Sequence, residues 1–239
     1  MTGRADSQVL KARDTLRNRV EALTAQLSDS AFQAAVWPEG AEAQRLYRNT
    51  IRSGAPYDSL RAWLLADSLT ATLKLYGVWP RRAEGDTYFS LYERWYLDAA
   101  STYVTDAVRE YLSMLAEEQE RPTGEDGSIM IGWSTLGDRL ARADRLLAGN
   151  PGAPFATDLA RSREQYLVLF LAGTDNAPIF TGREKRLKPE VLRSLENFAK
   201  VNADLPAAAD VNSFLKILRN NGLRETSAVK AYMRRLRAR

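Results

Sequence analysis

The hydrophobic positions of the chain are densest between Leu60 and Trp79. These 20 residues carry only three charged side chains, Arg61, Asp67 and Lys74. On a helical wheel the apolar residues occupy every side, which is typical of a helix that is buried all round or spans a membrane. The charges argue against a membrane span, because each is costly at the centre of a bilayer. The pattern therefore predicts a buried central helix over residues 60–79, wrapped by other helices.

Apolar residues at three- and four-residue steps predict further helices in the first half of the chain, over residues 5–35, 41–52 and 86–119. The last of these carries two apolar stripes, so we expect it to pack on two sides, as in a bundle or a helical stack. The sequence Val-Trp-Pro occurs at residues 36–38 and again at 78–80, and a period of 42 residues fits two-helix repeats. Chance placement of helix-ending prolines in a three-helix unit is the alternative.

The composition changes at residues 119–127, an acidic segment with a proline and two glycines. We predict a linker here. It separates an N-terminal helical bundle around the central helix, residues 1–118, from a C-terminal helical part with a basic tail, residues 128–239. Residues 128–133 form a short apolar run, which fits either a strand or the start of a helix.

The C-terminal part is predicted to be helical as well. Helices are expected at residues 136–147 and 155–172, the second with a buried strand as the alternative, and a long loop follows at 173–188. Residues 189–238 predict three short helices, and Pro189 suits the first position of one of them. The predicted fold class is therefore all-α: a helical bundle or short helical-repeat array with a smaller C-terminal three-helix part.

The chain contains neither cysteine nor histidine among its 239 residues. Disulfides, thiolate zinc sites and thiol nucleophiles are thereby excluded, and so are the commonest general base and metal ligand. Arginine outnumbers lysine 27 to 7, which favours a GC-rich bacterial coding sequence. The first residues lack the apolar segment of a signal peptide, so we expect none there. A leader or anchor upstream stays open, as does the choice between cytoplasm and periplasm.

Positive charge is concentrated at the C-terminal end. The net charge is +4 overall, but residues 182–239 alone carry 14 basic and 6 acidic side chains. Such asymmetry is typical of a surface for nucleic acid, anionic lipid or an acidic partner. Three short helices with a glycine turn also suit a helix-turn-helix, although basic residues near a helix end equally complement the helix dipole. The predicted basic patch consists of Arg219, Arg224, Lys230, Arg234, Arg235, Arg237 and Arg239.

Two further sets of side chains are candidate binding residues. The long loop is of a length that favours a function, and its polar members are Asp175, Asn176, Arg183, Lys185 and Arg186. Aromatic residues are dense between positions 76 and 111, and Tyr and Trp are good anchors for a partner helix, a peptide or a glycan. Plain core is the alternative, and the helical spacing favours it. The predicted partner-binding residues are Trp79, Tyr88, Tyr92 and Trp95.

The sequence holds no nucleophile elbow, Walker loop or dinucleotide fingerprint. Catalytic residues, metal ligands and cofactors are therefore not expected. Glycoside-type chemistry needs an acid in an apolar pocket and a second carboxylate nearby, and Glu93 and Asp67 are the candidates for it.

The sequence favours a non-enzymatic scaffold or adaptor. It would bind a protein partner through an apolar-aromatic groove, for example as the soluble part of a bacterial envelope or secretion assembly. A nucleic-acid-binding protein that uses the basic C-terminal helices is the first alternative. A carboxylate-dependent enzyme around Glu93 or Asp67 is the second.

Overall fold

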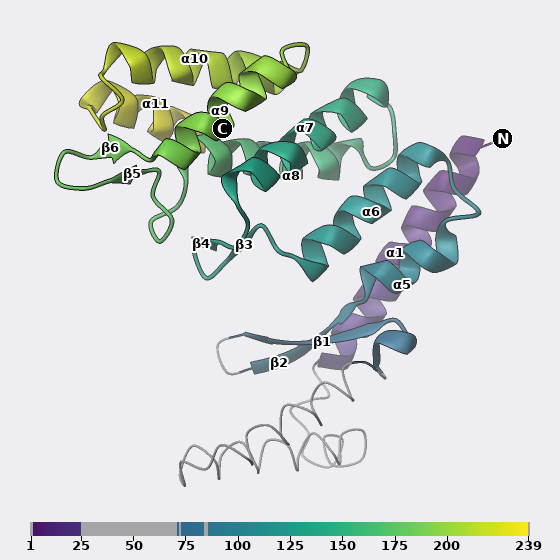
Figure 1. Ribbon diagram of the computed structural model, residues 1–239. Helices are drawn as coiled ribbons and strands as arrows, with labels where there is room; N and C mark the ends of the chain where they lie inside the picture. Colours follow the sequence, from purple (N-terminus) through teal and green to yellow (C-terminus); the bar gives the residue numbers. More distant parts are fainter. Residues whose placement is uncertain (1, 25–70, 72, 84–85, 239) are drawn as a thin grey trace, which may run out of the picture. The chain divides into compact units, whose positions relative to one another are not determined.

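A computed structural model describes residues 2–24, 71, 73–83 and 86–238 of the chain (Figure 1). The chain divides into two compact units, Met1–Ala116 and Glu117–Arg239. The predicted all-α fold class is confirmed, because helices dominate the described residues and the strands there form only short antiparallel hairpins. No helix in this described part of the chain is long and apolar enough to cross a membrane.

In the first unit, a long N-terminal helix packs against a β-hairpin. The helix is α1 (Thr2–Leu23), and the hairpin consists of β1 (Val78–Ala83) and β2 (Asp86–Leu91). Contacts between α1 and β2 join segments that are far apart in the sequence. Helix α5 (Glu93–Ala100) follows the hairpin, and α6 (Asp106–Glu120) begins in this unit.

Side-chain hydrogen bonds fasten α1 to the later helices. The Asp6 carboxylate accepts bonds from the backbone N–H and the hydroxyl of Thr105, at 3.0 and 2.8 Å. The Tyr96 hydroxyl donates to the carbonyl of Val9 at 2.6 Å. These bonds span about ninety residues of sequence and fix the start of α1 beside α5 and the turn before α6. The buried apolar side chains of this unit include Phe89, Leu91, Leu97, Val108 and Leu112.

Three predicted helices fall wholly or partly outside the described residues. Helix α1 confirms residues 5–23 of the helix predicted over residues 5–35, and residues 25–35 lie outside the described part of the chain. The helix predicted over residues 41–52 also lies outside, and so do residues 60–70 and 72 of the predicted central helix, whereas residues 71 and 73–75 are helical as predicted. For these ranges the predictions remain predictions.

The C-terminal end of the central helix is predicted wrongly, because Gly77 interrupts it. This glycine has φ +76, a left-handed conformation that glycine adopts without strain, and its carbonyl accepts a bond from the Tyr92 N–H at 2.8 Å. Val78 and Trp79 then pair with β2, where Val78 lies opposite Leu91. This copy of Val-Trp-Pro therefore begins a strand instead of ending a helix. The other copy lies outside the described residues, so the two-helix repeat stays a prediction.

The helix predicted over residues 86–119 is wrong in its first part, because residues 86–91 form strand β2. Buried Phe89 and Leu91 alternate there with half-buried Tyr88 and Ser90, and a burial period of two is typical of a strand. A turn then separates α5 from α6, so one long predicted helix is a strand and two helices.

The second unit is built from helices packed around one core. Helix α7 packs against α8 and α9, and α10 contacts α7, α8, α9 and α11. Its elements are β3 (Gly124–Glu125), β4 (Ser128–Ile129), α7 (Trp133–Gly149), α8 (Ala156–Ala172), β5 (Phe180–Thr181), β6 (Arg186–Leu187), α9 (Pro189–Val201), α10 (Pro206–Asn220) and α11 (Ser227–Arg237). Its most buried side chains include Leu140, Leu167, Phe170, Phe198 and Phe214.

Most helices predicted in this unit are confirmed. Helices α7 and α8 occupy the two ranges predicted after residue 133, so the strand alternative for residues 155–172 is wrong. Residues 189–238 form three short helices, as predicted. Residues 128–133 contain a two-residue strand followed by the first residue of α7, and the loop at 173–188 contains the β5–β6 hairpin. The predicted linker, residues 119–127, holds the end of α6 and strand β3.

Candidate functional site

The β5–β6 hairpin lies against the loop that joins α10 to α11 (Figure 1). The Leu187 N–H donates to the Leu223 carbonyl at 2.8 Å, and the Glu225 N–H donates to the Lys185 carbonyl at 2.9 Å. Arg186 and Arg224 form an isolated antiparallel bridge between these two bonds. The structure thus brings part of the predicted functional loop together with part of the predicted basic patch.

Local backbone conformation sets up this contact. Gly182 and Lys185 have φ +74 and +49, which closes the hairpin tip, and the Lys185 N–H donates to the Gly182 carbonyl at 3.1 Å. On the other side, Gly222 and Leu223 have φ +61 and +56 after the end of α10. Both turns leave backbone N–H and C=O groups facing each other, and those groups pair across the gap.

One carboxylate is shared by two arginines at this junction. Glu184 Oε2 accepts a bond from Arg186 Nε at 2.8 Å and pairs with Arg224 Nη2 at 3.1 Å. The bond from Arg186, and then the charge of Arg224, lower the pKa of Glu184 below its usual value. The three side chains are 58, 62 and 47% exposed, so the group retains a net positive charge in solvent.

Helix α11 extends this positive surface. Its 11 residues contain no acid, and its buried stripe is Val229, Met233 and Leu236. Its four cationic side chains are all exposed, and Arg234 and Arg235 are exposed together, as a helix-turn-helix would require. Lys230 pairs with Glu225, beside the hairpin, at 3.5 Å. We define the basic face as Arg183, Lys185, Arg186, Arg224, Lys230, Arg234 and Arg235.

Other predicted residues lie apart from the basic face. Arg219 pairs with Glu196 of α9 at 2.8 Å, and Arg237 donates to the Ala172 carbonyl at the end of α8 at 3.2 Å. Asp175 is exposed, and Asn176 donates to the Asp126 carbonyl in the β3–β4 turn at 2.9 Å. The structure does not describe Arg239. The predicted loop therefore divides between two places, and only its basic half joins the basic face.

The predicted aromatic set belongs to the first unit, and part of it is brought together. The Trp79 and Tyr92 rings meet edge to face with centroids 5.2 Å apart, and Lys74 Nζ lies 3.7 Å from the Trp79 ring centroid. Trp95 is stacked close to Gly77, since a Cβ there would meet its ring at 2.7 Å. Tyr88 is half-buried, as are the other three aromatic side chains. The contact with Lys74 is a cation–π interaction that the sequence pattern did not reveal.

The carboxylate Glu93 is buried in an ion pair. Arg13 Nε donates to its Oε2 at 2.8 Å, and Arg13 Nη2 pairs with its Oε1. Burial opposes the charged form of Arg13, but Glu93 raises its pKa above the usual value. Both oxygens of Glu93 are therefore committed to the guanidinium. Asp67 lies outside the described residues, and no group of three or more potential metal ligands occurs within them.

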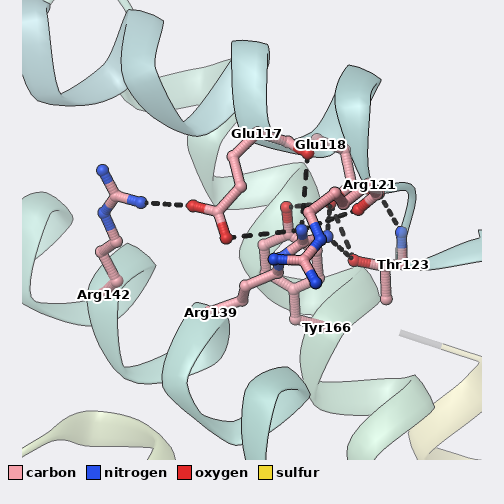
Figure 2. Close-up of polar contacts among 7 residues, drawn as sticks. All are labelled: Glu117, Glu118, Arg121, Thr123, Arg139, Arg142 and Tyr166. Carbon is pink, nitrogen blue, oxygen red and sulfur yellow. Dashed lines mark hydrogen bonds and ion pairs between the residues drawn. The ribbon is translucent and has the colours of Figure 1, made fainter. Parts of the chain in front are cut away.

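A polar cluster that the sequence did not reveal surrounds Arg139 in the second unit (Figure 2). Glu118 Oε2 accepts bonds from Arg139 Nη1 at 2.7 Å, the Tyr166 hydroxyl at 2.9 Å and the Thr123 hydroxyl at 2.8 Å. Arg139 Nη2 also donates to the Arg121 carbonyl at 2.7 Å. Burial, and then the charge of Glu118, raise the pKa of Tyr166. Because the polar groups of the cluster satisfy one another's hydrogen-bonding capacity, we assign the cluster a role in stability and not in catalysis.

Comparison of the chain with protein-family models, with curated proteins and with solved structures finds no match.

Proposed function

We propose that the second unit binds the phosphate backbone of nucleic acid through the basic face. The observation that carries this proposal is the bridge between Arg186 and Arg224, which joins two cationic segments about forty residues apart into one surface. Exposed arginine and lysine side chains bind phosphates and release counterions as they do so. Binding of this kind needs no imidazole, thiol or metal.

The position of the two arginines supports an anionic ligand. Like charges directly opposite each other in a strand pair are destabilising, and a single shared carboxylate neutralises only one of them. A phosphate placed beside Arg186 and Arg224 would remove the remaining repulsion. The exposed face of α11 adds cations without adding acids, so the attraction is not cancelled along the helix.

The test is the affinity for a labelled mixed-sequence DNA, measured by fluorescence anisotropy at several salt concentrations. If about four phosphates are contacted, the logarithm of the affinity falls with the logarithm of salt with a slope of about −3.6. We expect Lys185→Glu, and separately the pair Arg234→Glu and Arg235→Glu, to weaken binding by roughly tenfold or more.

Lys200→Glu is the matched control, because it makes the same charge change as Lys185→Glu. Lys200 is exposed near the far end of α9, about 18 Å along the helix axis from the hairpin. It should weaken binding only by about twofold, through the net charge. Equal losses in Lys185→Glu and Lys200→Glu, or no binding by the unaltered protein at low salt, would refute the proposal.

The second candidate function is that of a scaffold or adaptor whose first unit binds a protein partner. It is favoured by Leu75, at the end of a helical segment, and by Tyr76, in the turn that leads to the Trp79–Tyr92 pair, because each is 75% exposed. Exposed apolar and aromatic side chains next to one another are typical of a protein interface. The pair Leu75→Ser and Tyr76→Ser should abolish capture of a defined partner from the host lysate, while Val201→Ser, on an exposed residue of the second unit, should leave it unchanged.

A further inference from the structure

We infer that the basic face selects double-stranded nucleic acid, with α11 lying in the major groove and the hairpin tip on the flanking phosphates. This inference rests on the proposed function and adds the form of the ligand. It depends on which side chains surround the cations, on the shape of α11 and on the place of the hairpin relative to that helix.

The second unit offers no aromatic surface on which bases could stack. Proteins that bind single strands stack the bases on exposed aromatic rings. In residues 117–238 no aromatic side chain is exposed: six are buried, and only Trp133 and Tyr232 are half-buried. Trp133 donates its indole N–H to the Phe170 carbonyl, and Tyr232 stacks on Phe214 with ring centroids 5.2 Å apart. A single strand would therefore gain phosphate contacts here but no base stacking.

Helix α11 has dimensions that fit a major groove. Eleven residues make a helix of about 16 Å, and the major groove of a duplex is about 12 Å wide and admits one helix. Near its N-terminal end α11 carries small exposed side chains, Ser227 and Ala228, and the half-buried Ala231 follows Lys230. Short side chains let a helix approach the base edges closely, while Arg234 and Arg235 reach the edges and the phosphates.

The β5–β6 hairpin lies beside the start of α11. Its tip is bonded to the loop immediately before α11 through the Glu225 N–H and the Lys185 carbonyl. Arg183 and Lys185 are therefore near the N-terminal end of the helix and not along its length. When a helix occupies a groove, side chains beside its end meet the sugar-phosphate backbone at the edge of that groove. The two segments thus have separate parts in binding.

The experiment compares one duplex of about 20 base pairs with each of its separated strands at the same salt, and then probes the guanine N7 atoms of the bound duplex with dimethyl sulfate. Guanine N7 lies in the major groove. We expect the duplex to bind roughly tenfold more tightly than either strand and its N7 atoms to be protected.

Two double variants, each at a pair of exposed residues, distinguish the role of α11 from that of the hairpin. Arg234→Ala with Arg235→Ala should abolish N7 protection and reduce the preference for the duplex. Arg183→Ala with Lys185→Ala should weaken binding but keep the protection. Circular dichroism checks that each variant is folded. Equal affinity for duplex and single strands, or binding without N7 protection, overturns this inference and leaves the proposed function standing. Absence of binding to every nucleic acid overturns both.

Discussion

Arg139 gives the sharpest test of the forces that stabilise the second unit. Its side chain is 6% exposed and donates to Glu118, to Thr123 and to the Arg121 carbonyl (Figure 2). The substitution Arg139→Met keeps much of the side-chain stem and removes every donor. Breaking one side of a buried ion pair costs about 3–5 kcal/mol. Glu118 is 36% exposed and keeps its bonds from Thr123 and Tyr166, so we expect the lower end, about 3 kcal/mol.

Urea unfolding followed by circular dichroism measures this loss. Arg142→Met is the matched control on the same helix. Arg142 pairs with Glu117 at 2.8 Å, but the two side chains are 29 and 37% exposed, so its loss should cost less than about 1 kcal/mol. A loss in Arg139→Met no larger than that in Arg142→Met would show that the buried cluster does not stabilise the unit.

A double-mutant cycle with Glu118→Gln asks whether the two charges are coupled. Because they share a hydrogen bond at 2.7 Å, the double variant should lose less stability than the sum of the single losses. Strict additivity would show that Arg139 acts through its other bonds alone.

Three further predictions concern single residues. Gly77→Ala places a Cβ against the Trp95 ring at a φ of +76. Gly182→Ala is the control, because Gly182 has a φ of +74 but open space around it, and it should reduce the free energy of unfolding by about 1–2 kcal/mol. Gly77→Ala should reduce it clearly more, as a comparison of the urea midpoints would show. Because the pKa of Tyr166 is raised in the folded protein, the stabilisation by its protonated hydroxyl is complete below the unfolded pKa of about 10 and is lost as the pH rises above it. Tyr166→Phe should therefore make the free energy of unfolding fall less steeply between about pH 10 and 12. Asp144→Ala removes a 3% exposed carboxylate that accepts a bond from Arg163 at 2.7 Å and caps the start of α10 by accepting the Ala207 N–H at 2.6 Å. It should reduce the free energy of unfolding by about 3 kcal/mol, and a loss below about 1 kcal/mol would contradict this capping role.

The helices of the second unit could be predicted because their local signals agree with their packing. Pro189 begins α9, and the Thr226 hydroxyl caps α11 by accepting the Val229 N–H, so sequence and structure coincide at these ends. The β3–β4 hairpin was missed although Asp126 and Gly127 carry the signature of its turn, with φ +48 and +70. Two-residue strands leave too short a hydrophobic pattern to show an alternation.

The first unit was harder to predict because one stretch fits two periods. Tyr88, Phe89 and Leu91 can be placed on a helical stripe or on alternate faces of a strand, and only pairing with a partner strand decides between them. The candidate site shows the same limit. Its basic residues could be listed from the sequence, but not the backbone contact that joins the hairpin to the α10–α11 loop, because bonds between main-chain groups leave no trace in residue identity.

That contact has a consequence for how the molecule can change over evolutionary time. The main links between the hairpin and the α10–α11 loop are main-chain hydrogen bonds, so the exposed side chains at positions 183 and 185 are not needed for attachment, whereas Arg224 adds an ion pair to Glu184. The side chains at positions 183 and 185 can be substituted one by one while the main-chain hydrogen bonds between the hairpin and the loop are kept. Substitutions at these two positions are therefore expected to change the charge of this edge while the helices beneath it keep their packing.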